Sequence, residues 1–402
     1  MQVVVVGSGA REHALAWSLG RSPGLTELHA APGNPGIATF GRCHPVRADD
    51  ADGLLSLALT LDADLVVIGP EAPLVAGIAD VLRRNGIPVF GPSAAAARIE
   101  GSKAFAKEIL RTAGVATAET LSLARPPCVV KADGLAAGKG VFVCRTTEEV
   151  DDALRAVTAF GGEFVIEELL EGEELSLFAL SDGTRVVPLG AAQDFKRIGE
   201  GDTGPNTGGM GAYSPVPWLD DAPALVQQVH QPVVDELARR GTPFVGCLFA
   251  GLMMTPEGPK VLEFNARFGD PETQVLLPLL EADVLELLLA AAVGDLSGPA
   301  PLLAGTAAVT VVLAAPDYPA RSDHAGAPIS GLEAAEAAGA LVFHGGTAVR
   351  DGTVVTNGGR ILSVTGIGST VAEARARAYA AVDLISFEGV KFRRDIAAVA
   401  GG

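Results

Sequence analysis

Lysine is scarce in this chain, which has seven lysines and 23 arginines among its 402 residues. A GC-rich codon bias accounts for the imbalance, and it makes each remaining lysine a candidate for a required role. Five of the seven fall in the polar or glycine-rich stretches described below: Lys103, Lys107, Lys131, Lys139 and Lys196.

Cysteine and net positive charge are also lacking. The four cysteines, Cys43, Cys128, Cys144 and Cys247, form no CxxC pair. They indicate reduced core thiols in a cytoplasmic protein, not a disulfide framework or a metal site. The formal net charge of −18 excludes a nonspecific binder of nucleic acid or of membrane surfaces. It leaves room for a small anionic substrate, because local donors can override the global field.

Long apolar runs are absent. Gly, Pro or a charged residue interrupts each run well before the ~20 residues that a membrane span requires. The opening MQVVVVGSG has no basic segment, so we expect no signal peptide. The composition, 48% hydrophobic and 19% charged, is typical of a folded globular protein, and the length suits two or three domains.

The first hundred residues alternate between strand and helix patterns. We predict strands over residues 2–6, 27–31, 65–68 and 88–90, and helices over residues 11–19, 52–61 and 74–85. Repeated strand–helix units imply a doubly wound parallel sheet that binds ligands at the carboxyl ends of its strands.

Two of these strand ends carry candidate ligand groups. The first reads GSGAREHA, where Gly7 and Gly9 form a turn before a helix. A dinucleotide site is weakened by Glu12, which replaces the third glycine, and by the missing acidic residue after the second strand. The turn still suits a single phosphate. At the next strand end, in Gly69-Pro70-Glu71, the carboxylate of Glu71 can hold sugar hydroxyls or cap the following helix.

A glycine-rich loop, KADGLAAGKG over residues 131–140, lies between two β-branched runs. The pattern predicts two strands joined by a loop with Lys131 and Lys139 at its ends. Glycines let backbone N–H groups approach a polyphosphate, and lysine adds a mobile positive charge. The spacing differs from the Walker pattern, which continues into a helix. The alternative is an ordinary Gly/Ala-rich hairpin.

Polar groups recur farther along the chain. A strand predicted over residues 164–166 ends in an acidic cluster, Glu167 to Glu174, which can bind a ribose or an adenine edge or can be plain surface. Residues 193–215 show little periodicity, and we predict a long functional loop there. Its directed polar groups are Gln193, Asp194, Lys196, Arg197, Asn206 and Thr207.

The strand predicted over residues 261–264 ends in EFNAR. Glu263 and Asn265 alternate with apolar residues, so their oxygens point to one face of the strand. Two oxygen ligands at this spacing suit Mg²⁺ bridged to phosphates. Arg267 follows on the same face, where it can neutralise a transferring phosphoryl group. The alternative is an ordinary solvated edge strand.

The last hundred residues predict a separate α+β unit. We expect strands over residues 307–314, 341–344, 347–349 and 360–365, and a helix over residues 370–385. No dense cluster of reactive side chains is visible there. The isolated histidines His324 and His344 are interpreted as structural.

Seven motifs occur in order: GSGAREHALAW, APGNPG, GPEAPLV, GSKAFAK, VVKADGLAAGKGV, DTGPNTGGMGAYSP and EFNARFGDPETQ. Together with TNGGRILSVTG (residues 356–366), they make the whole chain resemble the phosphoribosylamine–glycine ligase family of ATP-grasp enzymes. The resemblance implies a multidomain α/β and α+β fold. It has an N-terminal doubly wound domain (1–101), an ATP-grasp domain (102–298) with a small mobile lid (about 115–190), and a C-terminal α+β domain (302–402).

The resemblance also implies an activity. Glycine's carboxylate attacks the γ-phosphate of ATP, and the amine of 5-phosphoribosylamine then attacks the glycyl phosphate, giving glycinamide ribonucleotide in purine synthesis. Cofactors are ATP and Mg²⁺ or Mn²⁺. Partners are the two small substrates, without nucleic acid or membrane, and a cytoplasmic monomer is expected. Phosphoryl transfer needs positioning and charge neutralisation, which agrees with the lack of a visible Ser/His/Asp or Cys/His arrangement.

Roles carry over onto matching residues. The catalytic pair is Arg267, stabilising the acyl phosphate, and Lys131. For ATP, the glycine-rich loop is the lid, residues 167–170 form the adenine hinge, and Glu174 holds the ribose. The full set of ATP contacts is Lys103, Lys131, Asp133, Gly134, Gly138, Lys139, Gly140, Glu167, Glu168, Leu170 and Glu174. Metal ligands are Glu263 and Asn265. Substrate residues are Gly9, Pro70 and Glu71 for the phosphoribosyl group, with Asp194, Asn206, Thr207, Gly208, Arg267, Asp270 and Glu272 around glycine and the amine.

One departure concerns the metal. Many ATP-grasp enzymes place an acidic ligand on the strand before EFN, but residues 249–254 contain none, which leaves open whether one or two ions bind. Two other functions are weighed: an ATP-grasp carboxylase that uses bicarbonate, and a nucleotide-binding module without turnover.

Overall fold

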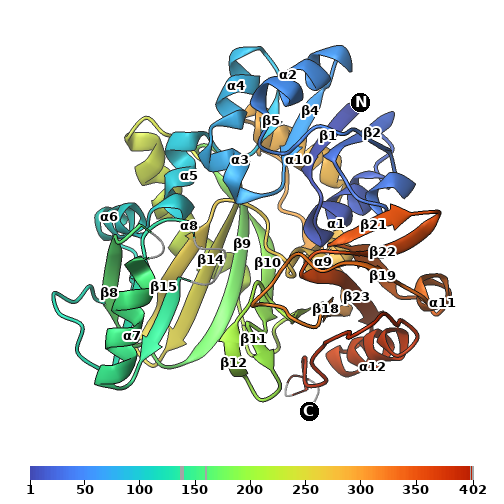
Figure 1. Cartoon of the computed structure of the whole chain (residues 1–402). Coiled ribbons are helices and arrows are strands. Elements are labelled where there is room, and N and C mark those ends of the chain that lie inside the picture. Colours follow the sequence, from blue (N-terminus) through green and yellow to red (C-terminus); the bar gives the residue numbers. More distant parts are fainter. Residues whose placement is uncertain (136–139, 159–160, 399, 401–402) are drawn as a thin grey trace.

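The structure is a computed structural model, and it describes residues 1–135, 140–158, 161–398 and 400 (Figure 1). The N-terminal part, blue in Figure 1, forms the parallel sheet that the sequence predicts. The strand order is β3-β2-β1-β4-β5, with β1 (Gln2–Gly7), β2 (Glu27–Pro32), β3 (Arg42–Cys43), β4 (Leu65–Ile68) and β5 (Val89–Phe90). The β-branched residues of β1 and β4 are buried because neighbouring strands and helices cover both faces.

Helices connect these strands. They are α1 (Ala10–Leu19), α2 (Ala51–Thr60), α3 (Glu71–Val75), α4 (Ile78–Arg84) and α5 (Ala94–Gly101), with a short 3₁₀ turn, η1 (Ile37–Thr39). The single helix predicted over residues 74–85 is wrong. Gly77 has a φ of 84°, in the left-handed region that glycine tolerates, and it separates α3 from α4.

An eight-stranded sheet forms the centre of the molecule. Its order is β15 (Gly258–Asn265), β14 (Val245–Thr255), β9 (Glu173–Asp182), β10 (Val186–Asp194), β13 (Gly211–Ser214), β18 (Ala307–Ala314), β23 (Arg360–Gly368) and β20 (Leu341–His344). Neighbouring strands are antiparallel. Strands from the last hundred residues therefore extend the same sheet that contains the predicted metal strand.

Helices cover both faces of this sheet. Leu177 and Ala179 of β9 pack with α8 (Ala222–Arg239), while Phe178 and Leu180 pack with α9 (Thr273–Leu279) and α10 (Val284–Val293). Burial on both faces explains why β9 lacks the apolar–polar alternation of a half-exposed strand and was not predicted. Among the described residues, no helix is both long and apolar enough to cross a bilayer.

The strands predicted on either side of the glycine-rich loop are confirmed. β6 (Cys128–Ala132) pairs antiparallel with β7 (Val141–Cys144) and with β8 (Phe164–Glu168), and together they form a three-stranded sheet. Helix α7 (Thr147–Val157) packs on this small sheet, and α6 (Lys103–Ala113) lies beside it in Figure 1. The Thr146 hydroxyl accepts from the N–H of Glu149, which caps α7.

The long loop predicted over residues 193–215 is wrong in part. It contains the end of β10, a hairpin of β11 (Arg197–Gly199) and β12 (Thr203–Asn206), and strand β13. These strands are three or four residues long and rich in glycine, so they carry little periodic signal.

The remaining C-terminal elements flank the central sheet. β19 (Ala325–Pro328), β22 (Thr353–Asn357) and β21 (Thr347–Arg350) form a separate three-stranded sheet, and β16 (Leu280–Glu281) pairs with β17 (Leu302–Leu303). Helices α11 (Leu332–Ala337) and α12 (Val371–Val382) complete this part, shown in orange and red in Figure 1. The predicted strands over residues 307–314, 341–344, 347–349 and 360–365 are all present.

Candidate active site

A cavity of about 1620 Å³ is lined by the small sheet, the central sheet and the loop after β4. Most residues that the sequence singled out lie on its wall: Pro70, Glu71, Lys103, Lys131, Gly134, Gly140, Glu167, Glu168, Leu170, Glu174, Asp194, Asn206, Thr207, Gly208, Glu263, Asn265, Arg267, Asp270 and Glu272. Gly9 lines a second cavity instead. Gly138 and Lys139 lie outside the described residues.

Two lysines converge on one buried carboxylate below the small sheet. Glu167 on β8 lies 2.6 Å from Nζ of Lys131 and 2.8 Å from Nζ of Lys107, measured from its two carboxylate oxygens. Lys131 also donates to the backbone oxygen of Leu262 at 2.9 Å. Burial lowers the pKa of Lys107, although the charge of Glu167 opposes this. The Glu167 side chain therefore holds the two lysines, and both of its carboxylate oxygens are engaged by them.

The start of the glycine-rich loop is fastened to helix α6. The carboxylate of Asp133 accepts from the N–H of Lys103 at 2.5 Å and from the hydroxyl of Ser102 at 3.2 Å. Lys103 in turn donates through Nζ to the backbone oxygen of Gly134 at 3.3 Å. The Asp133 side chain thus stabilises the N-terminus of α6 and does not line the cavity.

A fourth lysine bridges two acids on neighbouring strands. Nζ of Lys196 lies 2.8 Å from Glu174 on β9 and 2.8 Å from Asp194 on β10. The charge of Lys196 lowers the pKa of Glu174 against the effect of burial. Glu174 therefore presents an ionised acceptor to the cavity.

The predicted metal residues lie near the end of β15. Glu263 is opposite Gly251 and Asn265 is opposite Phe249 on β14, and both side chains line the cavity. Their oxygen-only donor set fits Mg²⁺. The described residues contain no group of three or more His, Cys, Asp or Glu side chains arranged to hold an ion. Further oxygens, from water or from a ligand, would complete the coordination of a metal held by these two side chains.

Arg267 is held between carboxylates from the N-terminal part. Its guanidinium lies 3.2 Å from Glu71 and 3.2 Å from Glu100, and it donates to Oδ1 of Asn265 at 3.2 Å. Glu100 also accepts from the N–H of Ala266 at 2.7 Å. Burial disfavours the charge of Arg267, but Glu100 and Glu71 outweigh it and raise its pKa. The guanidinium is therefore a fixed positive charge.

The two acids around Arg267 differ in their pKa values. Burial opposes ionisation of Glu71, but the charges of Arg267 and Arg11 outweigh it and lower its pKa. Burial raises the pKa of Glu100, although Arg267 opposes this. Sequence reasoning missed Glu100, since one acid in the alanine-rich helix α5 resembles ordinary helix surface.

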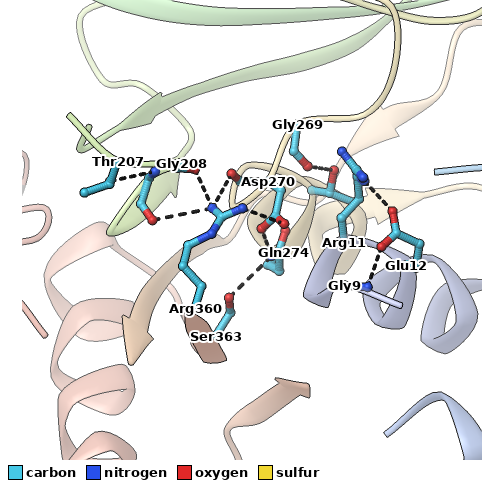
Figure 2. A network of polar contacts seen from close by, with 12 residues as sticks. Gly9, Arg11, Glu12, Thr207, Gly208, Gly269, Asp270, Gln274, Arg360 and Ser363 are labelled. Atoms are coloured by element: carbon cyan, nitrogen blue, oxygen red, sulfur yellow. Dashed lines mark hydrogen bonds and ion pairs between the residues drawn. The ribbon is translucent and has the colours of Figure 1, made fainter. Parts of the chain in front are cut away.

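The glycine turn after β1 is filled by a side chain (Figure 2). The carboxylate of Glu12 accepts from the N–H of Gly9 at 2.6 Å and from Arg11 at 2.6 Å. A Cβ at Gly69 would lie 2.1 Å from the same carboxylate. Because Glu12 fills the space beside the turn where a dinucleotide places its pyrophosphate, the structure argues against the dinucleotide alternative.

A second cavity of about 780 Å³ lies beside this turn. Its lining combines Gly9, Asn34 and residues of the C-terminal part, and it shares Asp270 and Arg360 with the first cavity. The three residues that the sequence predicts for the phosphoribosyl group therefore line different cavities: Gly9 lines the second, whereas Pro70 and Glu71 line the first.

Arg360 joins three segments at this junction (Figure 2). It donates to the backbone oxygens of Gly208 and Asp270, and to the carboxylate of Asp270 at 2.9 Å. The sequence motif around Arg360 resembles the family but indicates no role for this arginine, because the partners of Arg360 lie about 90 and 150 residues earlier in the chain.

Comparison with known proteins covers the full chain. Three family models match: phosphoribosylglycinamide synthetase N domain over residues 1–100, ATP-grasp (A) domain over residues 101–273, and C domain over residues 308–399. The phosphoribosylamine–glycine ligase of Streptomyces coelicolor is 53% identical, with 100% of both chains covered. That of Rhizobium meliloti is 48% identical, with 98% of each covered.

Solved structures agree. The phosphoribosylamine–glycine ligase of Thermotoga maritima superposes with a TM-score of 0.85 at 35% identity, covering 99% of this chain and 100% of that one. The biotin carboxylase domain of Hydrogenobacter thermophilus 2-oxoglutarate carboxylase superposes with a TM-score of 0.68 at 20% identity, covering 97% and 91%, a likeness of fold alone. From its sequence, its fold and these matches, the chain belongs to the phosphoribosylamine–glycine ligase family of ATP-grasp enzymes.

Proposed function

We propose that this chain uses ATP to join glycine to 5-phosphoribosylamine, giving glycinamide ribonucleotide, ADP and phosphate in de novo purine biosynthesis. The observation that carries the proposal is the full-length identity of 53% to a ligase of that name. One cavity lined by Lys131, Glu263 and Arg267 supports it. Glycyl phosphate is the intermediate: ATP phosphorylates glycine, and the amine then displaces phosphate.

ATP is proposed to lie between the small sheet and the central sheet. The side chains of Glu167 and Glu168 are taken up by lysines, so the backbone of residues 168–170 is left for the adenine edge. Glu174 suits the ribose, and Lys103 and Lys131 suit the phosphates. The loop over residues 133–140 then acts as the lid, and its first residue, Asp133, is anchored to the start of α6.

Glu263 and Asn265 are the proposed ligands of Mg²⁺ or Mn²⁺. When bound, the ion would neutralise phosphate charge and orient the terminal phosphoryl group. The side-chain oxygen of Asn265 accepts a hydrogen bond from Arg267, so this arginine fixes the orientation of the Asn265 side chain. With Gly251 opposite Glu263, β14 contributes no carboxylate, and we propose that these two side chains supply the protein's ligands from this strand pair.

Arg267 is proposed to stabilise the acyl phosphate, because Glu71 and Glu100 hold its guanidinium in place. The glycine and amine sites then lie around residues 206–208 and 270–272. For phosphoribosylamine, the phosphate is proposed to occupy the second cavity by Gly9, with Arg360 at the junction between the cavities.

The deciding experiment measures phosphate release from ATP. Release that requires both glycine and phosphoribosylamine, and does not occur with bicarbonate, supports the ligase. Release with bicarbonate would point to the carboxylase, and tight ATP binding without ADP formation would point to the nucleotide-binding module. We also propose a cytoplasmic monomer, which light scattering on the purified protein and cell fractionation test.

A further inference from the structure

Two carboxylates that line the large cavity meet at the buried hydroxyl group of Ser176. Oγ of Ser176 on β9 lies 3.2 Å from Oε1 of Glu272 and 3.3 Å from Oδ1 of Asp194. Glu272 is 3% exposed and Ser176 is 1% exposed, while both carboxylates also line the cavity. The three side chains come from β9, the end of β10 and the turn before α9.

Counting hydrogens shows which protonation state satisfies both contacts of the Ser176 hydroxyl. A serine hydroxyl has one proton, so it can donate to only one of the two carboxylates. If both were ionised, one of the contacts would join two acceptors. Both contacts are satisfied when the pair carries one proton, with one acid donating to Ser176 and Ser176 donating to the other. The geometry therefore suits a cluster that can hold one proton between the two acids.

The surrounding charges agree with this assignment. Burial, followed by the like charge of Asp194, raises the pKa of Glu272 to about 7, against the opposing charges of Lys196 and Arg267. The titratable groups facing Glu272 come from four other parts of the fold: Asp194, Lys196, Arg267, Arg360 and Cys247.

The ligation requires a proton acceptor at this stage. When the amine attacks glycyl phosphate, a nitrogen–carbon bond forms and the bond between the carbonyl carbon and the phosphate oxygen breaks. The phosphate leaves with that electron pair. The nitrogen then carries one proton too many, which must pass to a base. Attack by glycine's carboxylate on ATP, in the first step, releases no proton.

We propose that Glu272 accepts this proton as a carboxylate and that Ser176 shares it with Asp194. The inference rests on the proposed ligase function. Proton uptake converts the doubly ionised pair into the singly protonated pair whose contacts are all satisfied, so the repulsion between the two acids drives the transfer. Lys196, 2.8 Å from Asp194, stabilises the charge that remains.

The test separates the two half-reactions in the full-length enzyme. Hydroxylamine captures acyl phosphates without needing a strong base, because its nitrogen is weakly basic. For Glu272→Gln we expect glycine- and ATP-dependent hydroxamate formation to stay within about threefold of wild type, while glycinamide ribonucleotide formation falls roughly 10²–10⁴-fold. Equal loss of both would overturn the proposal and assign Glu272 to glycine binding.

A pH profile provides the second test. The wild-type rate of ligation should rise with pH through about 7, where the pair loses its proton. Asp194→Asn removes the like charge, lowers the pKa of Glu272 and should move this limb to lower pH. If the folded variant shows the same rise of rate with pH as the wild type, the proposed sharing of the proton between Glu272 and Asp194 is contradicted. Glu281→Gln, on an exposed acid of β16, should leave the rate and its dependence on pH unchanged.

The ligase function itself has a separate test. Wild-type enzyme that forms no product from glycine and phosphoribosylamine would reject that function.

Discussion

Nη2 of Arg360 on β23 lies 2.9 Å from the carboxylate of Asp270, which follows the proposed metal strand. The same guanidinium reaches the backbone oxygens of Gly208 and Asp270. One residue of the C-terminal part therefore fixes two loops: the loop of Gly208 lines the first cavity, and the loop of Asp270 borders both cavities. Burial opposes the charge of Arg360, yet Asp270, Tyr318 and Glu272 together outweigh it and raise the pKa of Arg360.

Arg360→Lys should impair the use of phosphoribosylamine more than the use of glycine. Lysine keeps the charge but lacks the planar fork that reaches several oxygens at once. We expect KM for phosphoribosylamine to rise by about tenfold or more, which corresponds to ~1.4 kcal/mol. Steady-state kinetics with each substrate varied in turn measures this. Arg350→Lys, at the exposed end of β21, is the matched control, and an equal rise of both KM values would contradict the assignment.

Glu263→Ala should abolish turnover while the protein stays folded. The carboxylate is a proposed metal ligand, and its loss removes a charge that holds the ion beside the phosphates. ADP release at saturating Mg²⁺ is expected to fall by roughly 10²–10³-fold, with an unchanged circular dichroism spectrum. Near-normal activity would remove the metal assignment.

Lys131→Ala and Lys107→Ala provide a matched pair. Each removes one of the two lysines on Glu167, so each leaves that buried acid with one cation. Only Lys131 is a proposed phosphate contact. We expect the Lys131 variant to show the larger rise in KM for ATP, measured beside the thermal midpoint of both. If both variants show the same rise in KM for ATP and the same loss of stability, the role of Lys131 is structural only.

Two buried histidines predict acid sensitivity. His13 on α1 accepts from the backbone N–H of His344 at 2.8 Å. Burial, and then His344, lowers the pKa of His13 to about 3; burial lowers that of His344 to about 4. Because both pKa values are depressed below the ordinary 6.5, their stabilisation is complete above pH 6.5 and is lost as the pH falls.

The expected loss is on the order of 2–3 kcal/mol per histidine between pH 6.5 and pH 4.5. Urea unfolding across this range measures it. In His13→Asn the amide oxygen can still accept from His344, but no imidazole must be protonated. Its free energy of unfolding should therefore fall less steeply with acid. An unchanged slope would show that other groups dominate.

Local patterns made much of this fold predictable. The valine-rich β1 and β4, the paired strands around the glycine loop, and the alternation of Glu263 and Asn265 on β15 all act over a few residues. Their periodicity therefore appears directly in the sequence. Strand β9 could not be predicted from periodicity, because both of its faces are buried. The helix predicted over residues 74–85 is two helices, because Gly77 has a left-handed conformation.

The parts of the site that sequence reasoning missed depend on contacts between distant segments. Glu100 reaches Arg267 across 167 positions, and Ser176 reaches Glu272 across 96. No local motif marks such residues, because an acid in an alanine-rich helix or a serine in a buried strand has many uses. Asp133 shows the opposite limit: its motif was recognised, but its carboxylate caps a helix.

The continuous central sheet has a consequence for how the chain folds. β13 pairs with β18, and β23 lies between β18 and β20. Strands that are synthesised early therefore pair with strands that are synthesised near the end of translation. During synthesis, Gly211–Ser214 remains an unpaired edge until about a hundred further residues have emerged, and unpaired edges recruit other chains. Late pairing across such separations is slow. We therefore expect the nascent chain to need protection from self-association until its final segment leaves the ribosome.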